Sequence, residues 1–176
     1  CKGFCTDDHL DASGRTVSGR PKKQSGPGFD ELRREVAGGR IQPLYLFEGP
    51  EQYLQEQALR LLYDSVDEGL RVFNVTKFSI GSDNGAGSKT TAAMAVDAAN
   101  QMPMMSSRRI VVIRELDKIR EDELELVLAY LKSPAPTTTM VFQAVALDRR
   151  RKLTGALIKA CTVVTFALLE EGGARR

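Results

Sequence analysis

Tryptophan is absent from this sequence, and histidine, cysteine and aromatic residues are scarce. The 176 residues include one His, three Cys and 6% aromatic residues. The lone His9 lies in a polar N-terminal segment, so a Ser-His-Asp or Cys-His catalytic site in the rest of the chain is excluded. Cys1 and Cys5 share that segment while Cys161 lies in an apolar stretch, which indicates no disulfide framework. Cys1, Cys5 and His9 supply fewer than the four ligands of a closed zinc site, so we expect no metal.

Long apolar runs and a strong charge of either sign are also missing. No run approaches the length of a membrane span, and the N-terminus lacks the pattern of a signal peptide, so we expect a cytoplasmic protein without membrane contact. Residues 1–27 carry five Lys/Arg and three Asp/Glu, whereas residues 28–176 carry twenty of each. A neutral body predicts that any contact with DNA is indirect, because strong DNA binding needs a basic surface.

The hydrophobic content of 42% is enough for one core, which predicts a single domain with extensions. Residues 1–28 are rich in Gly, Ser and charged side chains and are predicted to be a disordered leader or a non-native extension. The domain is expected over residues 29–168. Short apolar runs, several of them continuous, predict strands over 43–49, 72–80, 108–115, 138–145 and 162–166. Between them, helical patterns predict helices over 29–39, 50–67, 90–100, 122–133 and around Leu153–Ala160. This order favours a three-layer α/β fold with a mostly parallel five-stranded sheet.

A parallel sheet of this kind invites a search for a phosphate-binding loop after its first strand, at residues 48–57. Gly49 opens that motif, but Leu54 stands where the second glycine is needed. Gln55 and Glu56 replace the required Lys and Ser or Thr, and Glu56 would repel a phosphate. The sequence therefore predicts a degenerate nucleotide site that binds no nucleotide.

A second glycine-rich segment, residues 81–90, is the basis of an alternative function. It contains Gly85, Gly87, Lys89 and Thr90 between a strand and a helix, but its spacing departs from the motif. An active NTPase or kinase that uses this loop remains the alternative. At the end of the third strand, Arg114 stands where a magnesium-binding carboxylate would begin, although Glu115 and Asp117 follow it.

Charged residues elsewhere are most simply solvated surface. This interpretation covers the acidic helix start with Glu121, Asp122, Glu123 and Glu125. The basic run 148–152 is predicted to be the solvated start of a helix with Asp148 near its N-cap, and contact with phosphate or an acidic partner is the alternative.

Segment 101–113, QMPMMSSRRIVVI, places two adjacent methionines on a short connection before a strand. Connections run over the surface, so Met104 and Met105 are candidates for an exposed apolar contact with another protein. The alternative is that both methionines fill gaps in the core.

Several segments together resemble one family. PLYLFEGPEQYLQEQAL, FNVTKFSI, MPMMSSRRIVVIRELDKI, TTTMVFQAVALDRRRKL and TVVTF, within residues 39–166, are similar in order and spacing to the N-terminal domain of the DNA polymerase III delta subunit, a bacterial clamp-loader protein. The resemblance implies an AAA+-like fold that has lost nucleotide binding. It implies a non-catalytic subunit of the polymerase holoenzyme, without cofactors.

The resemblance also assigns a binding site and partners. In this family a hydrophobic pair before the third strand enters a pocket on the beta sliding clamp and helps to open it, and here that pair is Met104 and Met105. Met102 and Pro103 would shape the approach, with Ser106, Ser107 and Arg108 at the rim. The more usual pair includes Leu and Phe. The family continues into lid and collar domains that join the gamma/tau and delta prime subunits, so residues 169–176 are expected to be a truncated tail.

Overall fold

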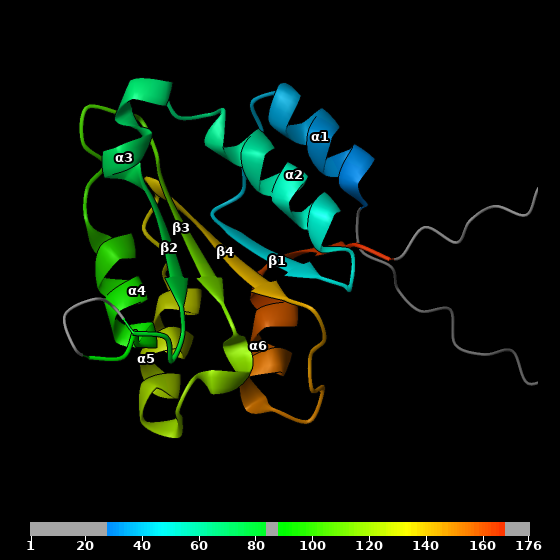
Figure 1. Cartoon of the computed structure of the whole chain (residues 1–176), viewed down its shortest axis with the longest axis vertical. Helices are drawn as coiled ribbons and strands as arrows, with labels where there is room; N and C mark the ends of the chain where they lie inside the picture. Colours follow the sequence, from blue (N-terminus) through cyan, green and yellow to red (C-terminus); the bar gives the residue numbers. More distant parts are fainter. Residues whose placement is uncertain (1–27, 84–87, 168–176) are drawn as a thin grey trace, which may run out of the picture.

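The computed structural model describes residues 28–83 and 88–167, and its centre is a five-stranded sheet (Figure 1). The strands are β1 (Leu44–Glu48), β2 (Val75–Ser79), β3 (Arg109–Arg114), β4 (Thr138–Ala144) and β5 (Thr162–Thr165). Their spatial order is β2-β3-β4-β1-β5, and all four neighbouring pairs are parallel. The predicted parallel five-stranded sheet is therefore confirmed.

Helices cover both faces of the sheet. α1 (Phe29–Ala37) and α2 (Gln52–Tyr63) lie on one face, and α4 (Ala92–Asn100), α5 (Glu121–Lys132) and α6 (Lys152–Ala160) lie on the other (Figure 1). Strand residues alternate between the two cores because successive side chains point to opposite faces. Leu46 packs beneath the second group of helices, while its neighbours Tyr45 and Phe47 pack beneath the first.

The predicted second strand is too long at its start. Val72, Phe73 and Asn74 belong to the short helix α3 (Arg71–Asn74), which follows the 3₁₀ turn η1 (Glu68–Leu70). Sequence reasoning read their β-propensity as extended backbone. β2 is an edge strand whose neighbour β3 begins at Arg109, and pairing starts with Val75 opposite Ile110. Extending this register places Val72 and Phe73 beyond the start of β3, where they have no strand residue to pair with, so tertiary context overrides their propensity.

The helix predicted from Pro50 to Asp67 is also shorter, since α2 covers only Gln52–Tyr63. A further 3₁₀ turn, η2 (Leu116–Lys118), follows β3. The predicted leader and its Cys1, Cys5 and His9 lie outside the described residues, as do the tail 169–176 and the two glycines Gly85 and Gly87. Among the helices of ranges 28–83 and 88–167, none is long and apolar enough to cross a bilayer.

Candidate functional site

The loop before β3 carries its methionines on the surface. The exposed fractions are 75% for Met102, 51% for Met104 and 85% for Met105, so these side chains do not fill the core. Pro103 is half-buried between them. Met105 has a φ of +50°, in the left-handed region that non-glycine residues seldom adopt. Because such a conformation persists only where surrounding contacts impose it, the shape of this loop is determined by its neighbours.

Asn74 supplies the main contact that fixes the loop. Its side chain is fully buried, and its Oδ1 accepts a hydrogen bond from the Met104 N–H at 2.7 Å. Its Nδ2 donates to the Met104 carbonyl at 2.8 Å and to the Leu70 carbonyl at 3.0 Å. The Met104 backbone is thus held at both of its polar groups while its side chain remains in solvent. Sequence reasoning missed Asn74, since an Asn within an apparent strand gives no signal of such a contact.

The predicted rim residues stabilise the loop from its other side. Ser106 Oγ contacts both backbone groups of Arg108, at 3.2 and 3.4 Å. The Arg108 guanidinium donates to Thr139 Oγ1 at 2.7 Å, and the buried Arg109 donates to the Met102 carbonyl at 3.4 Å. Ser106 and Arg108 are half-buried and Ser107 is exposed. Both Ser106 and Arg108 therefore have an internal role besides any contact with a partner.

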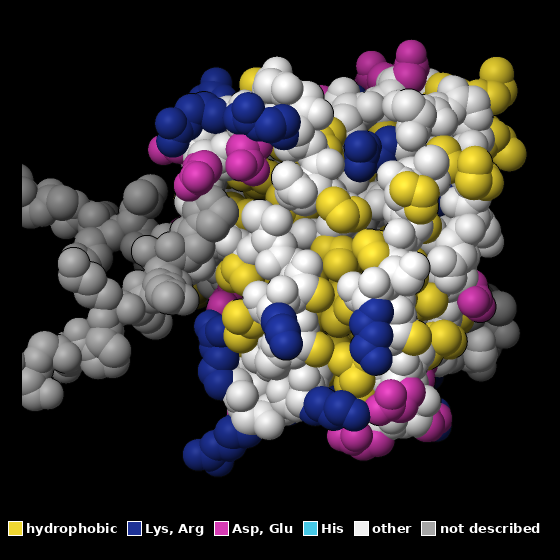
Figure 2. Space-filling model, turned by 180° about the vertical axis from the view of Figure 1, so that it is seen from behind, with side chains coloured by type: hydrophobic (Ala, Val, Ile, Leu, Met, Phe, Trp, Pro, Cys, Tyr) yellow, Lys and Arg dark blue, Asp and Glu magenta, His cyan; other side chains and the backbone are white. Residues whose placement is uncertain are grey.

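A second apolar segment lies next to this loop. Val72 and Phe73 on α3 are 78% and 51% exposed, and the residue that follows them, Asn74, is the one that holds Met104. Figure 2 shows hydrophobic side chains at the upper right corner of the molecule, where α3, at the upper left of Figure 1, lies after the turn. We call residues 102–105 the methionine loop. The methionine loop precedes β3 and α3 precedes β2, so both lie at the end of the sheet where the parallel strands begin, its amino edge.

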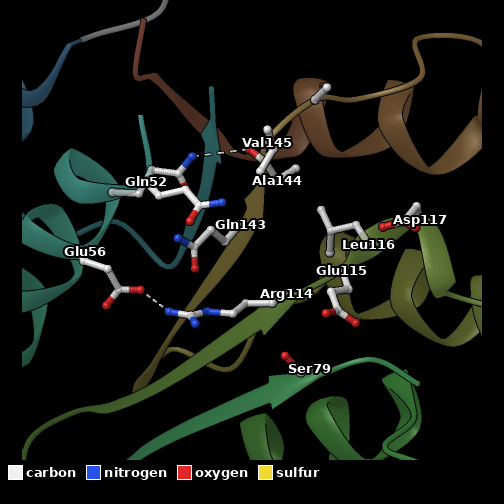
Figure 3. Close-up of a pocket in the computed structure, with 12 residues that line it drawn as sticks. Gln52, Glu56, Ser79, Arg114, Glu115, Leu116, Asp117, Gln143, Ala144 and Val145 are labelled. Carbon is white, nitrogen blue, oxygen red and sulfur yellow. Dashed lines mark hydrogen bonds and ion pairs between the residues drawn. The ribbon is translucent and has the colours of Figure 1, made fainter. Parts of the chain in front are cut away.

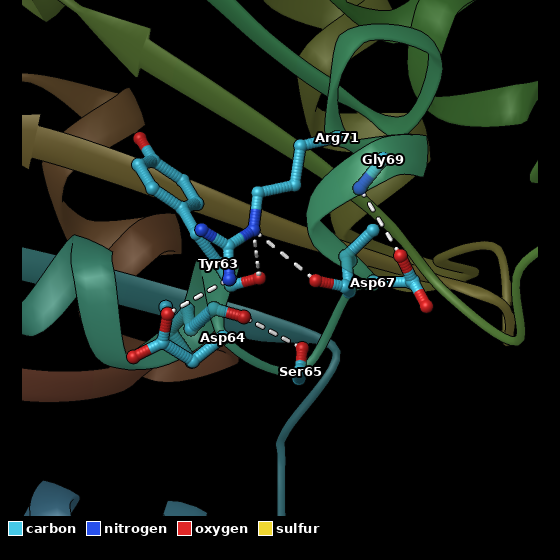
Figure 4. Close-up of polar contacts among 8 residues, drawn as sticks. Tyr63, Asp64, Ser65, Asp67, Gly69 and Arg71 are labelled. Atoms are coloured by element: carbon cyan, nitrogen blue, oxygen red, sulfur yellow. Dashed lines mark hydrogen bonds and ion pairs between the residues drawn. The ribbon is translucent and has the colours of Figure 1, made fainter.

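Arg71 attaches α3 to the end of α2 (Figure 4). Its Nε donates to the carbonyls of Tyr63 and Val66, both at 3.1 Å, and its Nη2 pairs with Asp64 at 2.9 Å. The side chain of Asp67 accepts from the Gly69 N–H at 3.1 Å and closes the intervening turn. The short helix is consequently fixed at its first residue.

The opposite, carboxyl edge of the sheet contains a cavity of about 420 Å³. Figure 3 shows Arg114 reaching from β3 across this cavity to Glu56 on α2, with Glu115 and Asp117 on the far wall. Glu56 forms ion pairs with Arg114 and, at 3.8 Å, with Lys77. Burial, followed by the negative charge of Glu56, raises the pKa of the adjacent Tyr63 hydroxyl well above its ordinary value. Partly exposed ion pairs thus line the edge where α/β folds usually bind ligands.

The four residues predicted to form a degenerate nucleotide site lie together at this edge. Gly49 has a φ of +145° and packs against the backbone of Phe166. Gln55 is buried, and its Nε2 donates to the Gly49 carbonyl at 2.7 Å and to the Ala144 carbonyl at 3.4 Å. Leu54 is half-buried and packs against the core beneath α1 and α2. The Gln55 side chain therefore ties the turn after β1 to the end of β4 and lines the cavity at this edge.

The first backbone amides of α4, after the loop 81–90, already bind an acidic side chain of the chain itself. Glu123 is 9% exposed, and its Oε1 accepts from the Ala92 N–H at 2.9 Å and the Ala93 N–H at 3.5 Å. The prediction that Glu123 is solvated surface is wrong. Its largely buried carboxylate accepts hydrogen bonds from the first backbone amides of α4. Phosphate would need those same amides, so this geometry does not favour the NTPase alternative.

The basic run 148–152 makes contacts within the chain. Arg149 pairs with Glu48 at 2.7 Å, and Lys152 pairs with Glu125 at 2.8 Å. Arg151 donates to the carbonyls of Leu116, Asp117 and Ile119 at 3.0 to 3.2 Å. The N-cap of α6 is Arg151, three residues after Asp148, whose side chain accepts a hydrogen bond from the Arg150 N–H. Among the described residues, no group of three or more His, Cys, Asp or Glu side chains is arranged to hold a metal ion.

Comparison with known proteins gives one family. The sequence model of DNA polymerase III, delta subunit, matches residues 45–167. The structure is similar to that of the Bacillus subtilis DNA clamp loader delta protein, with a TM-score of 0.69 and 25% identity over 79% of this chain and 42% of that one. A DNA polymerase III gamma subunit-related protein from Thermotoga maritima shares the fold, with a TM-score of 0.56 and 13% identity over 81% of this chain and 47% of that one. A search of curated proteins finds no match. The chain therefore spans less than half the length of the two similar structures.

Proposed function

This chain belongs to the DNA polymerase III delta subunit family, and on that premise we propose that it acts in a clamp loader by binding the beta sliding clamp through Met104 and Met105. The observation that carries the proposal is the exposure of both methionines, 51% and 85%, on a backbone held by Asn74. A loop fixed in advance loses little conformational entropy on binding. Residues 29–168 form the clamp-binding domain in this proposal.

Burial of two methionine side chains in an apolar clamp pocket contributes roughly 3–6 kcal/mol before the cost of association. Met102 and Pro103 shape the approach, and Ser106, Ser107 and Arg108 supply the polar rim. Opening of the clamp follows if the subunit binds the open form more tightly than the closed form, since a ligand shifts an equilibrium only by differential affinity. The gamma/tau and delta prime subunits are the further partners, and DNA is reached indirectly through the clamp.

The subunit performs no catalysis and binds no nucleotide in this proposal. Support comes from the buried Gln55 beneath Gly49 and from the Glu56 ion pairs across the carboxyl edge. The Glu123 carboxylate at the start of α4 takes the place that a phosphate would need at the loop 81–90. Clamp loading by this chain therefore depends on binding free energy, and ATP is hydrolysed by other subunits.

Calorimetric titration of the whole chain into the cognate sliding clamp tests the proposal. We expect binding by the wild-type chain and a loss of at least about a hundredfold in affinity for Met104→Ala/Met105→Ala. The matched control is Met94→Ala/Leu126→Ala, which removes two exposed hydrophobic side chains of α4 and α5 and should leave the affinity unchanged. Circular dichroism verifies that each variant is folded.

Absence of clamp binding by the folded wild-type chain would contradict the proposal. Titration with Mg-ATP separates it from the NTPase alternative, because ATP binding that disappears in Lys89→Ala would favour an active nucleotide site instead. We expect no heat of binding with ATP.

A further inference from the structure

The exposed hydrophobic side chains of this fold are unevenly distributed. Of the ten large ones among residues 28–83 and 88–167, five lie on α3 and the methionine loop: Val72, Phe73, Met102, Met104 and Met105. Single exposed hydrophobic residues are ordinary, whereas contiguous groups usually mark interaction sites. The three methionines have a proposed partner, and Val72 and Phe73 have none.

Val72 and Phe73 lie between two anchored residues. On one side, Arg71 donates to the Tyr63 and Val66 carbonyls at the end of α2. On the other side, the fully buried Asn74 bonds to the Leu70 carbonyl. A four-residue helix has little stability of its own, so these contacts define its shape. They also leave the two intervening hydrophobic side chains in solvent on a fixed backbone.

Asn74 also makes α3 and the methionine loop a single unit. Its amide bonds to both the N–H and the carbonyl of Met104, at 2.7 and 2.8 Å, although the two residues are thirty positions apart. Phe73 is the residue before Asn74 in the chain. A partner that buries the Met104 side chain therefore comes close to Phe73 as well. The two segments therefore lie side by side, and both expose apolar side chains at this end of the fold.

We propose that Val72 and Phe73 are the second half of the docking surface and contact an apolar area of the sliding clamp beside the pocket that receives the methionines. This inference rests on the proposed function. The aromatic ring of Phe73 buries more area at lower entropic cost than a methionine does, and aromatic anchors commonly dominate interfaces. The exposed Asp64, Asp67 and Glu68 beside α3 form a polar rim.

The test compares Val72→Ala/Phe73→Ala with Tyr53→Ala/Val145→Ala by calorimetric titration of the whole chain into the clamp. The control pair also combines an aromatic and a valine, 68% and 52% exposed, but lies at the carboxyl edge of the sheet. We expect the α3 variant to bind at least about tenfold more weakly and the control to stay within about twofold.

The outcomes separate the two proposals. Wild-type affinity of the α3 variant, together with weak binding by Met104→Ala/Met105→Ala, would overturn the two-part surface and leave the proposed function intact. No binding by the wild-type chain would overturn the proposed function itself.

A spectroscopic experiment gives a direct readout that needs no loss of binding. The chain has no tryptophan, so Phe73→Trp can carry 5-fluorotryptophan as its single label. We expect a ¹⁹F chemical-shift change and loss of solvent accessibility when unlabelled clamp is added, and no such change for Tyr53→Trp. An unchanged Phe73→Trp signal in a complex that is otherwise saturated would overturn the inference.

Discussion

Asn74 and Met104 form a two-point contact in which one side-chain amide satisfies both polar groups of one backbone residue, with distances of 2.7 and 2.8 Å. Such a contact needs a donor and an acceptor in one rigid, planar group, which the Asn side chain provides without carrying a charge. Because Asn74 joins α3 to the methionine loop, it is a positioning residue for the proposed docking surface.

The substitution Asn74→Asp tests this contact through pH. The variant keeps an acceptor for the Met104 N–H but places an oxygen against two carbonyls, those of Leu70 and Met104. We expect a loss of about 2–3 kcal/mol in unfolding free energy at pH 7, because a buried charge meets two acceptors. Chemical denaturation of the variant and the wild type measures it.

The sign of the pH dependence follows from the protonated form of the Asn74→Asp variant. Its new carboxyl group, when protonated, can donate to a carbonyl, so the folded state raises the pKa of this carboxyl above the unfolded value of about 3.9. The folded chain then binds more protons, and the variant loses stability as pH rises from about 4 through the raised pKa. A constant difference from the wild type between about pH 4 and pH 7 would contradict this account.

Glycine is required at position 49 and dispensable at position 155. A Cβ at Gly49, where φ is +145°, would lie 2.0 Å from the Phe166 carbonyl oxygen, whereas a Cβ at Gly155 in α6 meets nothing within 4 Å. We expect Gly49→Ala to lower the unfolding free energy by more than about 3 kcal/mol. Gly155→Ala should raise it by about 0.5–1 kcal/mol because alanine lowers the backbone entropy of the unfolded chain, which the helix must overcome on folding. Thermal unfolding distinguishes the two, and equal effects would show that the turn at Gly49 is not strained by a side chain.

Glu123 should matter for stability far more than its neighbour Glu121. The Glu123 carboxylate satisfies the amides of Ala92 and Ala93, while Glu121 is exposed. Glu123→Ala leaves those helix amides without their partner and should cost about 2–3 kcal/mol, against less than about 0.5 kcal/mol for Glu121→Ala. Hydrogen exchange at the Ala92 and Ala93 amides provides a local readout, and unchanged protection there would contradict the assignment.

The Cys161 thiol should react slowly in the folded protein. Burial raises its pKa to about 12, so little thiolate is present at pH 8. In a Cys1→Ser/Cys5→Ser background we expect a thiol reagent to modify Cys161 at least about tenfold more slowly in the folded than in the denatured protein. Because the folded pKa is raised, stability should fall as pH rises above about 8.5, the unfolded value, towards the folded pKa. Rapid labelling at pH 8 would contradict the raised pKa of this partly buried thiol.

The sequence predicted the sheet well because continuous apolar runs such as residues 110–113 leave few alternatives to a strand buried on both faces. It placed Gly49, Leu54, Gln55 and Glu56 at one site because a single turn after β1 connects them. The α3 residues and Glu123 were misjudged for a common reason. Their conformation and burial depend on partners 30 residues away or more, Met104 for Asn74 and Ala92 for Glu123, and local patterns carry no information about such pairs.

Because all five strands are parallel, the loops that precede the strands lie at one end of the sheet and the loops that follow them lie at the other. The methionine loop and α3 precede strands and lie at one end, whereas the end of β5, Gly49 and the Arg114–Glu56 ion pair lie at the other. With strands of five residues or so, about 17 Å of packed sheet separates them. A bulky tag, a surface linker or a fluorophore attached near Tyr53 and Val145 should therefore leave the opposite end free. The carboxyl edge is thus the suitable site for immobilising this protein in single-molecule work.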